Sequence, residues 1–174
     1  MKKIILMTVL VALIANLAWS TANPACGTSY LKIDKFMVDY YTAYNLYAQD
    51  AATIDQMDKY WAPEFFSIQF LPVPQYPVMD LTTWKNFLVL LHSTLLETLV
   101  VEEMSIDTRN LCVTARIKIL LNDRATGALI VSVDGIAFYN LKVERGGKIL
   151  ITCLKLYFAN PGALMAVSPP PPGF

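Results

Sequence analysis

The chain has 174 residues, of which 55% are hydrophobic and 16% charged, and its fourteen basic side chains match fourteen acidic ones. This composition excludes an intrinsically disordered chain, and the length fits one domain. Because the charges balance and no run of lysine or arginine occurs, nothing would neutralise a phosphate backbone. We therefore expect no nucleic-acid partner.

The N-terminus has the layout of a secretory signal peptide. Two lysines precede an apolar run over residues 4–18, and the small residues Ser20 and Ala22 follow it. The run is too short to span a bilayer, so we expect cleavage near Ala22, no stable membrane insertion, and a periplasmic or secreted protein. The alternative is a lipoprotein acylated at Cys26, but the residues before this cysteine match a lipidation signal poorly.

Helical periodicity dominates the first half of the remaining chain. Apolar residues recur every three to four positions and predict a helix over Ile33–Tyr47, a short helix between Asp50 and Pro63, and a long helix over Leu81–Val100. A strand is predicted over Phe65–Leu71, between the second and third helices.

Three long strands are predicted in the second half, over Met104–Leu121, Leu129–Leu141 and Lys148–Phe158. Turn-forming residues at 122–127 and 145–147 predict an antiparallel meander. Helices followed by a meander indicate the α+β class, with three N-terminal helices packed on the concave face of a curved antiparallel sheet. Residues 161–174 are rich in proline and predict a flexible tail.

The two faces of this meander differ in polarity. If Leu121 opposes Leu129, then Arg116 opposes Asp134 and the even-numbered residues share a face of mixed character, whereas the odd-numbered face is almost wholly apolar. We interpret the odd face as a convex surface that forms a homodimer, and the even face as the wall of a cavity under the helices. The alternative is that the helices pack on the odd face and that Arg116 and Asp134 form an exposed cross-strand pair.

Cysteine and histidine provide no metal site. The three cysteines form no CxxC pair, and His92 is the only histidine, so we expect no metal and no cofactor. Cys112 and Cys153 belong to the first and third strands of the meander, which would hold them too far apart for a disulfide. On a helical wheel, His92 lies at the polar edge of the third helix, so we expect it to be exposed to solvent.

Several short strings resemble the nuclear transport factor 2-like superfamily, which includes the ketosteroid isomerases and the SnoaL-like polyketide cyclases. These strings are FMVDYYTAYN (36–45), TIDQMDKYWAPEFF (53–66), VDGIAFYN (133–140) and GGKI (146–149). The resemblance implies a cone-shaped fold, and we assign the domain to residues 23–160. It also implies that Tyr40 and Asp134 match an oxyanion-binding pair, whereas Gln69 stands where a ketosteroid isomerase has its carboxylate base and cannot accept the proton.

Two functional hypotheses follow. The first is a domain that binds a small, largely apolar molecule in its cavity without catalysis. The side chains expected to line this cavity are Tyr44, Gln69, Thr114, Phe138, Leu154 and Leu156. The second is a SnoaL-like isomerase, lyase or cyclase in which Asp134 is the general base, Arg116 orients it, and Tyr40 donates a hydrogen bond to the substrate oxygen.

Overall fold

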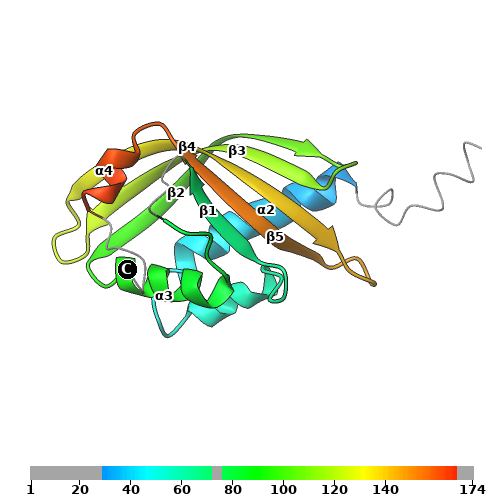
Figure 1. The fold of residues 1–174 in the computed structure, drawn as a ribbon, viewed down its shortest axis with the longest axis horizontal. Coiled ribbons are helices and arrows are strands. Elements are labelled where there is room, and N and C mark those ends of the chain that lie inside the picture. Colours follow the sequence, from blue (N-terminus) through cyan, green and yellow to red (C-terminus); the bar gives the residue numbers. More distant parts are fainter. Residues whose placement is uncertain (1–28, 72–75, 168–174) are drawn as a thin grey trace, which may run out of the picture.

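The computed structural model of the chain describes residues 29–71 and 76–167 (Figure 1). The predicted signal peptide over residues 1–22 and the alternative lipidation site at Cys26 lie outside the described residues. The elements in chain order are α2 (Tyr30–Tyr47), the 3-10 helix η2 (Ile54–Lys59), β1 (Ser67–Leu71), α3 (Leu81–Leu91), β2 (Leu95–Asp107), β3 (Cys112–Asp123), β4 (Leu129–Val143), β5 (Ile149–Phe158) and α4 (Pro161–Met165). None of the described helices is both long enough and apolar enough to cross a membrane.

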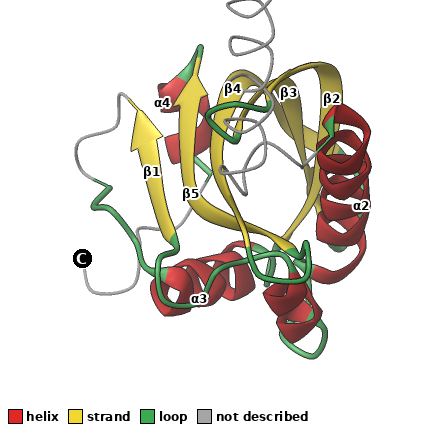
Figure 2. Cartoon of the chain, turned by 90° about the vertical axis from the view of Figure 1, so that its right-hand side faces the viewer, coloured by secondary structure: helices red, strands yellow, loops and turns green. Residues whose placement is uncertain are grey.

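The five strands form one curved, unclosed sheet in the order β1-β5-β4-β3-β2. Figure 2 shows α2 beside β2 at one edge of the sheet and α3 across its lower side, so the helices cover the concave face. The predicted α+β class is therefore confirmed. The sheet is not wholly antiparallel, however, because β1 pairs in parallel with β5, next to Leu154 and Leu156.

The predicted helix over Leu81–Val100 is wrong in its second half. α3 ends at Leu91, and the chain continues as the edge strand β2 from Leu95. Every second residue from Leu95 to Leu99 is buried, which is the period of a strand and not of a helix. A leucine-rich segment satisfies both periods over a short window, and the β-branched residues that follow favour the strand.

The predicted strand over Met104–Leu121 is two strands, the end of β2 and most of β3. A turn separates them, in which the carboxylate of Asp107 accepts hydrogen bonds from the main-chain N–H groups of Arg109 and Asn110. Leu111 completes this turn with a φ of 51°. Positive φ is unusual for a branched side chain, and neither glycine nor proline is present to indicate the turn.

The register between β3 and β4 differs from the prediction by two residues. Asp134 lies opposite Lys118, and Arg116 lies opposite Ile136. A bulge beside Leu121 and a longer turn account for this shift. Because a shift of two keeps side chains on the same face, the prediction that the even-numbered residues of β3 and β4 share a face holds.

The assignment of these faces to the inside and the outside is wrong. On β4 the odd residues Val133, Ala137 and Tyr139 are buried, whereas the even residues Asp134 and Phe138 are exposed. The helices therefore pack on the odd, apolar face, because burying it removes the larger apolar area from water. The alternative is therefore correct in placing the helices on the odd face, but the exposed pair that it expected does not form: Asp134 pairs with Lys118, and Arg116 pairs with Glu102.

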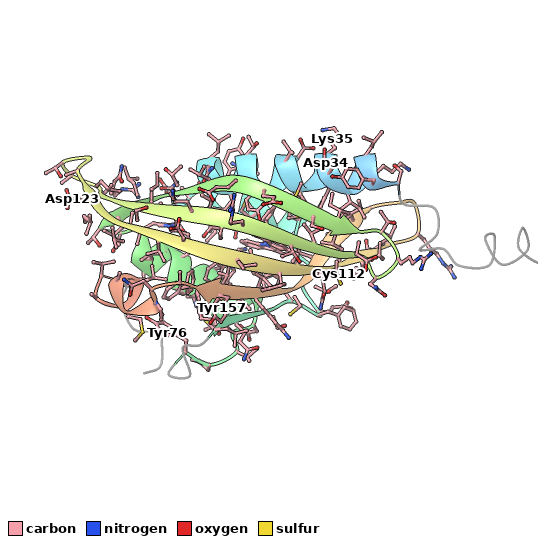
Figure 3. The ribbon with its side chains drawn as sticks, turned by 90° about the horizontal axis from the view of Figure 1, so that it is seen from above. Asp34, Lys35, Tyr76, Cys112, Asp123 and Tyr157 are labelled. Atoms are coloured by element: carbon pink, nitrogen blue, oxygen red, sulfur yellow. The ribbon has the colours of Figure 1, made fainter. Side chains whose placement is uncertain are left out.

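The outer face of the sheet, shown in Figure 3, carries charges as well as apolar side chains. Ion pairs join Arg116 and Lys118 to Glu102, while Ile136, Phe138 and Tyr157 are between about a third and a half exposed. The odd face lies in the core, so it is not the uncovered apolar surface from which the homodimer was predicted. Association through the outer face remains a prediction.

The predicted separation of two cysteines is confirmed. Cys112 on β3 and Cys153 on β5 lie on either side of Asn140 on β4, and both are free thiols. Two strand spacings amount to about 10 Å, which exceeds the Cα separation of a disulfide.

The chain after β5 is helical where a flexible tail was expected. Asn160 caps α4, whose first residue is Pro161, and the Asn160 side chain accepts a hydrogen bond from the main-chain N–H of Ala163. Proline is favourable at this position because its φ angle suits the first helical turn. Residues 168–174, which contain the four consecutive prolines, lie outside the described residues.

Candidate functional site

The cone contains a partly open cavity of about 40 Å³ between the inner face of the sheet and the helices. Its wall is mainly aromatic and aliphatic, with Tyr40 from α2, Phe70 from β1, Trp84 from α3, Tyr139 from β4 and Leu164 from α4. Among the described residues that line it, Glu97 is the only one with a side chain that ordinarily carries a charge at neutral pH. The cavity is therefore apolar with a single carboxyl group in its wall.

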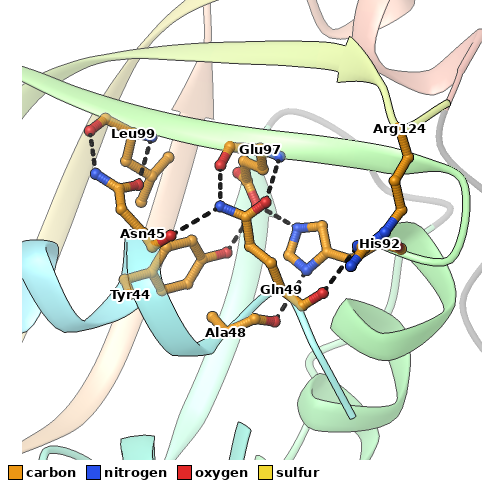
Figure 4. A network of polar contacts seen from close by, with 8 residues as sticks. All are labelled: Tyr44, Asn45, Ala48, Gln49, His92, Glu97, Leu99 and Arg124. Carbon is orange, nitrogen blue, oxygen red and sulfur yellow. Dashed lines mark hydrogen bonds and ion pairs between the residues drawn. The ribbon is translucent and has the colours of Figure 1, made fainter. Parts of the chain in front are cut away.

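Glu97 is held at the cavity by two polar partners from different helices. Its carboxyl oxygen Oε2 accepts a hydrogen bond of 2.9 Å from the hydroxyl of Tyr44 and lies 3.0 Å from Nε2 of His92 (Figure 4). Only 5% of Glu97 is exposed. A carboxyl group buried to this extent needs such partners, because removal from water without hydrogen bonds is costly.

His92 is buried, and the prediction that it is exposed to solvent is wrong. It is the C-cap of α3 and is 2% exposed, with Nδ1 lying 2.9 Å from the main-chain oxygen of Ala48. The helical wheel did not apply, because the helix ends one residue earlier and the ring turns inward toward Glu97. Arg124 from the turn after β3 donates hydrogen bonds to the main-chain oxygens of His92 and Gln49, at 2.7 and 3.1 Å.

Two side-chain amides, one in α2 and one just after it, hold the main chain of β2 by hydrogen bonds. Oδ1 of Asn45 accepts from the N–H of Leu99 at 2.8 Å, and its Nδ2 donates to the Leu99 oxygen at 3.0 Å. Gln49 forms the same pair of bonds with the N–H and the oxygen of Glu97. Since β2 is an edge strand, these amides satisfy groups that would otherwise be unpaired, and they hold Glu97 in place.

The tyrosines beside Glu97 form a buried aromatic cluster. Tyr40 makes edge-to-face contacts with Tyr41 and Tyr139 at centroid distances of 5.4 and 5.8 Å, and it contacts Tyr44 at 6.1 Å. Burial raises the pKa of each of these four phenols, and for Tyr44 the nearby Glu97 charge raises the pKa further. They therefore remain neutral hydrogen-bond donors over the physiological pH range.

The predicted site residues divide between the two faces of the sheet. Tyr40, Tyr44, Leu154 and Leu156 line the cavity as expected. The register between β4 and β5 shifts beside Asn140 of β4. This shift brings the even-numbered residues in the second half of β5 to the inner face, which is why Leu154 and Leu156 are correctly placed.

The remaining predicted site residues lie away from the cavity. The side chains of Asp134 and Arg116 are 66% and 59% exposed on the outer face. Gln69, Thr114 and Phe138 also alternate outward, next to buried neighbours. Asp134 is thus not a general base in the cavity, and the reason is the exchange of the inner and outer faces in the prediction.

Glu97 and His92 were missed as site residues. The available signal was the alternation Leu95-x-Glu97-x-Leu99, which places one carboxyl group on the apolar face of a strand. A helix assigned to the same residues obscured it. No local pattern indicated His92, because its partner Ala48 is 44 positions away and its other partner, Glu97, was assigned to the same helix.

The arrangement of sheet, helices and cavity can be compared with known proteins. No protein-family model and no curated protein matches the sequence. The ketosteroid isomerase-like protein from Erwinia carotovora atroseptica aligns with a TM-score of 0.51 and 12% identity, over 73% of this chain and 93% of that one. The chain has the cone-shaped fold of the nuclear transport factor 2-like superfamily. The predicted resemblance is confirmed at the level of the fold.

Two further solved structures share this cone fold. A candidate SnoaL-like polyketide cyclase from Jannaschia sp. CCS1 aligns with a TM-score of 0.55 and 14% identity, over 79% of this chain and 94% of that chain. The BvnE pinacolase from Penicillium brevicompactum aligns with a TM-score of 0.59 and 12% identity, over 80% and 92%. At these identities the likeness concerns the fold, and function has to be argued from the site.

Proposed function

We propose that the cone binds a small, largely apolar molecule, with a polar atom of that molecule placed at the Glu97 carboxyl group. The observation that carries this proposal is an aromatic and aliphatic cavity with one carboxyl group in its wall. Apolar pockets with few polar groups are typical of small-molecule sites, in which the polar group sets orientation. A volume of about 40 Å³ exceeds the space needed for a single water molecule but is smaller than the roughly 150 Å³ of a cavity that holds benzene, so a ring-sized ligand requires the side chains of the wall to move apart.

Binding can be tested with cyclopentanol as the probe, by ligand-observed NMR. A Leu156→Phe substitution adds a ring to the cavity wall and is expected to weaken binding about tenfold or more. The matched control is Ile136→Phe, which adds a ring to the outer face of the next strand and should leave binding unchanged. Equal affinities in the two variants would contradict binding in the cavity.

A second candidate function is acid–base catalysis by Glu97 on a bound carbonyl compound. It is favoured by the contact between Glu97 and His92, because a carboxyl group with a second titratable group behind it can accept and return a proton. The two cone-fold proteins above, a candidate cyclase and a pinacolase, are named as enzymes, which is consistent with this candidate. They do not identify a reaction for this chain.

Catalysis can be tested without a known substrate. Cyclopentanone in heavy water exchanges the hydrogens next to its carbonyl group, and proton NMR follows their loss. Acid–base catalysis predicts faster exchange with the wild-type protein than with Glu97→Gln, which preserves the shape of the side chain and removes the base. Exchange no faster than in buffer would exclude this activity on cyclopentanone and leave the binding function.

We also propose that the protein acts outside the cytoplasm. The support is the predicted signal peptide over residues 1–22. Mass spectrometry of the protein recovered from the periplasm or medium is expected to give an N-terminus at Asn23. An N-terminus at Cys26 with the added mass of lipid would instead support the lipoprotein alternative.

A further inference from the structure

The hydrogen bonds of His92 restrict where its protons are. Its Nδ1 lies 2.9 Å from the main-chain oxygen of Ala48, and its Nε2 lies 3.0 Å from Oε2 of Glu97. A carbonyl oxygen only accepts hydrogen bonds, so Nδ1 must carry a hydrogen. The neutral tautomer with its hydrogen on Nε2 alone would turn a lone pair toward the Ala48 oxygen.

The contact between Nε2 and Oε2 then requires one proton. Without it, a nitrogen lone pair would face a carboxylate oxygen in a place where both residues are buried. If Nε2 holds the proton, the pair is an imidazolium and a carboxylate; if Oε2 holds it, the pair is a neutral imidazole and a neutral acid. In both arrangements the net charge of the pair is zero.

The other ionisable groups near the pair do not change this charge. Tyr44 faces Glu97 from α2, and Arg124 reaches main-chain oxygens rather than the carboxyl group. The remaining ionisable side chains among the described lining residues are Tyr40, Tyr76 and Tyr139, which are phenols with raised pKa. The cavity is therefore uncharged overall near neutral pH.

We infer that the cavity selects uncharged ligands: apolar molecules with a hydroxyl or carbonyl oxygen at Glu97, in preference to amines or carboxylates of the same shape. The inference rests on the proposed binding function and specifies its ligand class. A lone buried carboxylate would attract an amine strongly, and His92 cancels this attraction. His92 is thus the residue that determines specificity, although it does not line the cavity.

The ligand class can be tested with isosteric probes, cyclopentanol and cyclopentylamine, titrated by NMR near neutral pH. The wild-type protein is expected to bind the alcohol at least about tenfold more tightly than the amine. His92→Gln retains a hydrogen-bond donor and loses the titratable proton, so the ratio should move toward the amine by about tenfold, as expected for a gained charge-assisted hydrogen bond.

A second measurement does not depend on any ligand or on the folding of the variant. Because His92 is the only histidine in the sequence, proton–nitrogen correlation NMR of a chain without a histidine tag reports its protonation state directly. A hydrogen on Nδ1 is expected. A ring with its hydrogen on Nε2 alone would overturn the inference.

The outcomes separate this inference from the function on which it rests. Wild-type protein that binds cyclopentylamine as tightly as cyclopentanol would overturn the uncharged ligand class and retain the binding function. Wild-type protein that binds neither probe at any concentration reached would overturn the binding function and the inference together. Preference for the alcohol, with a hydrogen on Nδ1, would support both.

Discussion

The amide contacts between α2 and the edge strand lead to a prediction that separates stability from function. Gln49→Ala removes the two hydrogen bonds to the main chain of Glu97 and a third, of 3.0 Å, to the main-chain oxygen of Asn45. At about 1 kcal/mol for each hydrogen bond, the free energy of unfolding should fall by about 2 to 3 kcal/mol. Asn45→Ala removes two bonds to Leu99 and should lower it by about 2 kcal/mol.

The two variants are expected to differ in ligand binding. Gln49→Ala releases the segment that carries the Glu97 carboxyl group, so the affinity for cyclopentanol should fall several-fold. Asn45→Ala acts two residues further along β2 and should leave that affinity close to the wild-type value. Urea unfolding gives the stabilities, and NMR titration gives the affinities.

A third variant tests the hydrogen-bond geometry itself. Gln49→Glu keeps the shape of the side chain and still accepts from the Glu97 N–H, but it places a carboxylate oxygen against the Glu97 main-chain oxygen. It should therefore be at least as unstable as Gln49→Ala. If both alanine variants lose less than about 0.5 kcal/mol, or if both weaken ligand binding equally, the proposed role of Gln49 in positioning Glu97 is wrong.

Three further predictions concern the core and the outer face. The folded state raises the pKa of four buried tyrosines, so their contribution to stability is complete below about pH 10 and falls above it, by about 1.4 kcal/mol per tyrosine per pH unit. We expect tyrosinate absorbance to appear and circular dichroism to be lost in one cooperative step as the pH rises. Separate titrations of the tyrosines in a chain that stays folded would contradict this. Gly135→Ala would place a Cβ 2.9 Å from the main-chain oxygen of Tyr157, so thermal unfolding should show that the free energy of unfolding falls by about 1 to 3 kcal/mol. A variant as stable as the wild type would refute the close approach of β4 to β5 at this residue. If the protein is a homodimer through the outer face, it should sediment at about twice the monomer mass, and Phe138→Lys should sediment as the monomer. A wild-type protein that is monomeric at micromolar concentration would disprove the dimer.

The elements that could be predicted from the sequence are those whose signals are local. α2 repeats buried residues at helical spacing from Ile33 to Tyr44, and the turn between β4 and β5 contains Gly146 and Gly147, both with positive φ. The alternation of side chains along β3 and β4 also survived an error of two in the register, because side-chain direction has a period of two. These features depend on neighbours within a few residues.

The side of the sheet that the helices cover could not be obtained in the same way. The odd face of the predicted meander is the more apolar one, but an apolar face can be buried under helices or against a second copy of the chain, and the pattern along the strands does not distinguish the two. With β2 in the sheet, the inner face gains Leu95, Glu97 and Leu99, and the outer face gains charged residues. Two errors therefore account for the choice of Asp134 in place of Glu97: the exchange of the two faces placed Asp134 in the cavity, and the helix assigned to the β2 residues concealed Glu97.

The pair of Glu97 and His92 shows why the sequence pattern of one segment does not reveal such a site. A buried carboxyl group is tolerated only where it has hydrogen-bond partners, and here they are Tyr44 from the last turn of α2 and His92 from the C-cap of α3. Each partner is unremarkable in its own segment. Their common function arises only because the helices close the cone over β2, so the same packing that buries Glu97 also supplies the groups that make its burial possible.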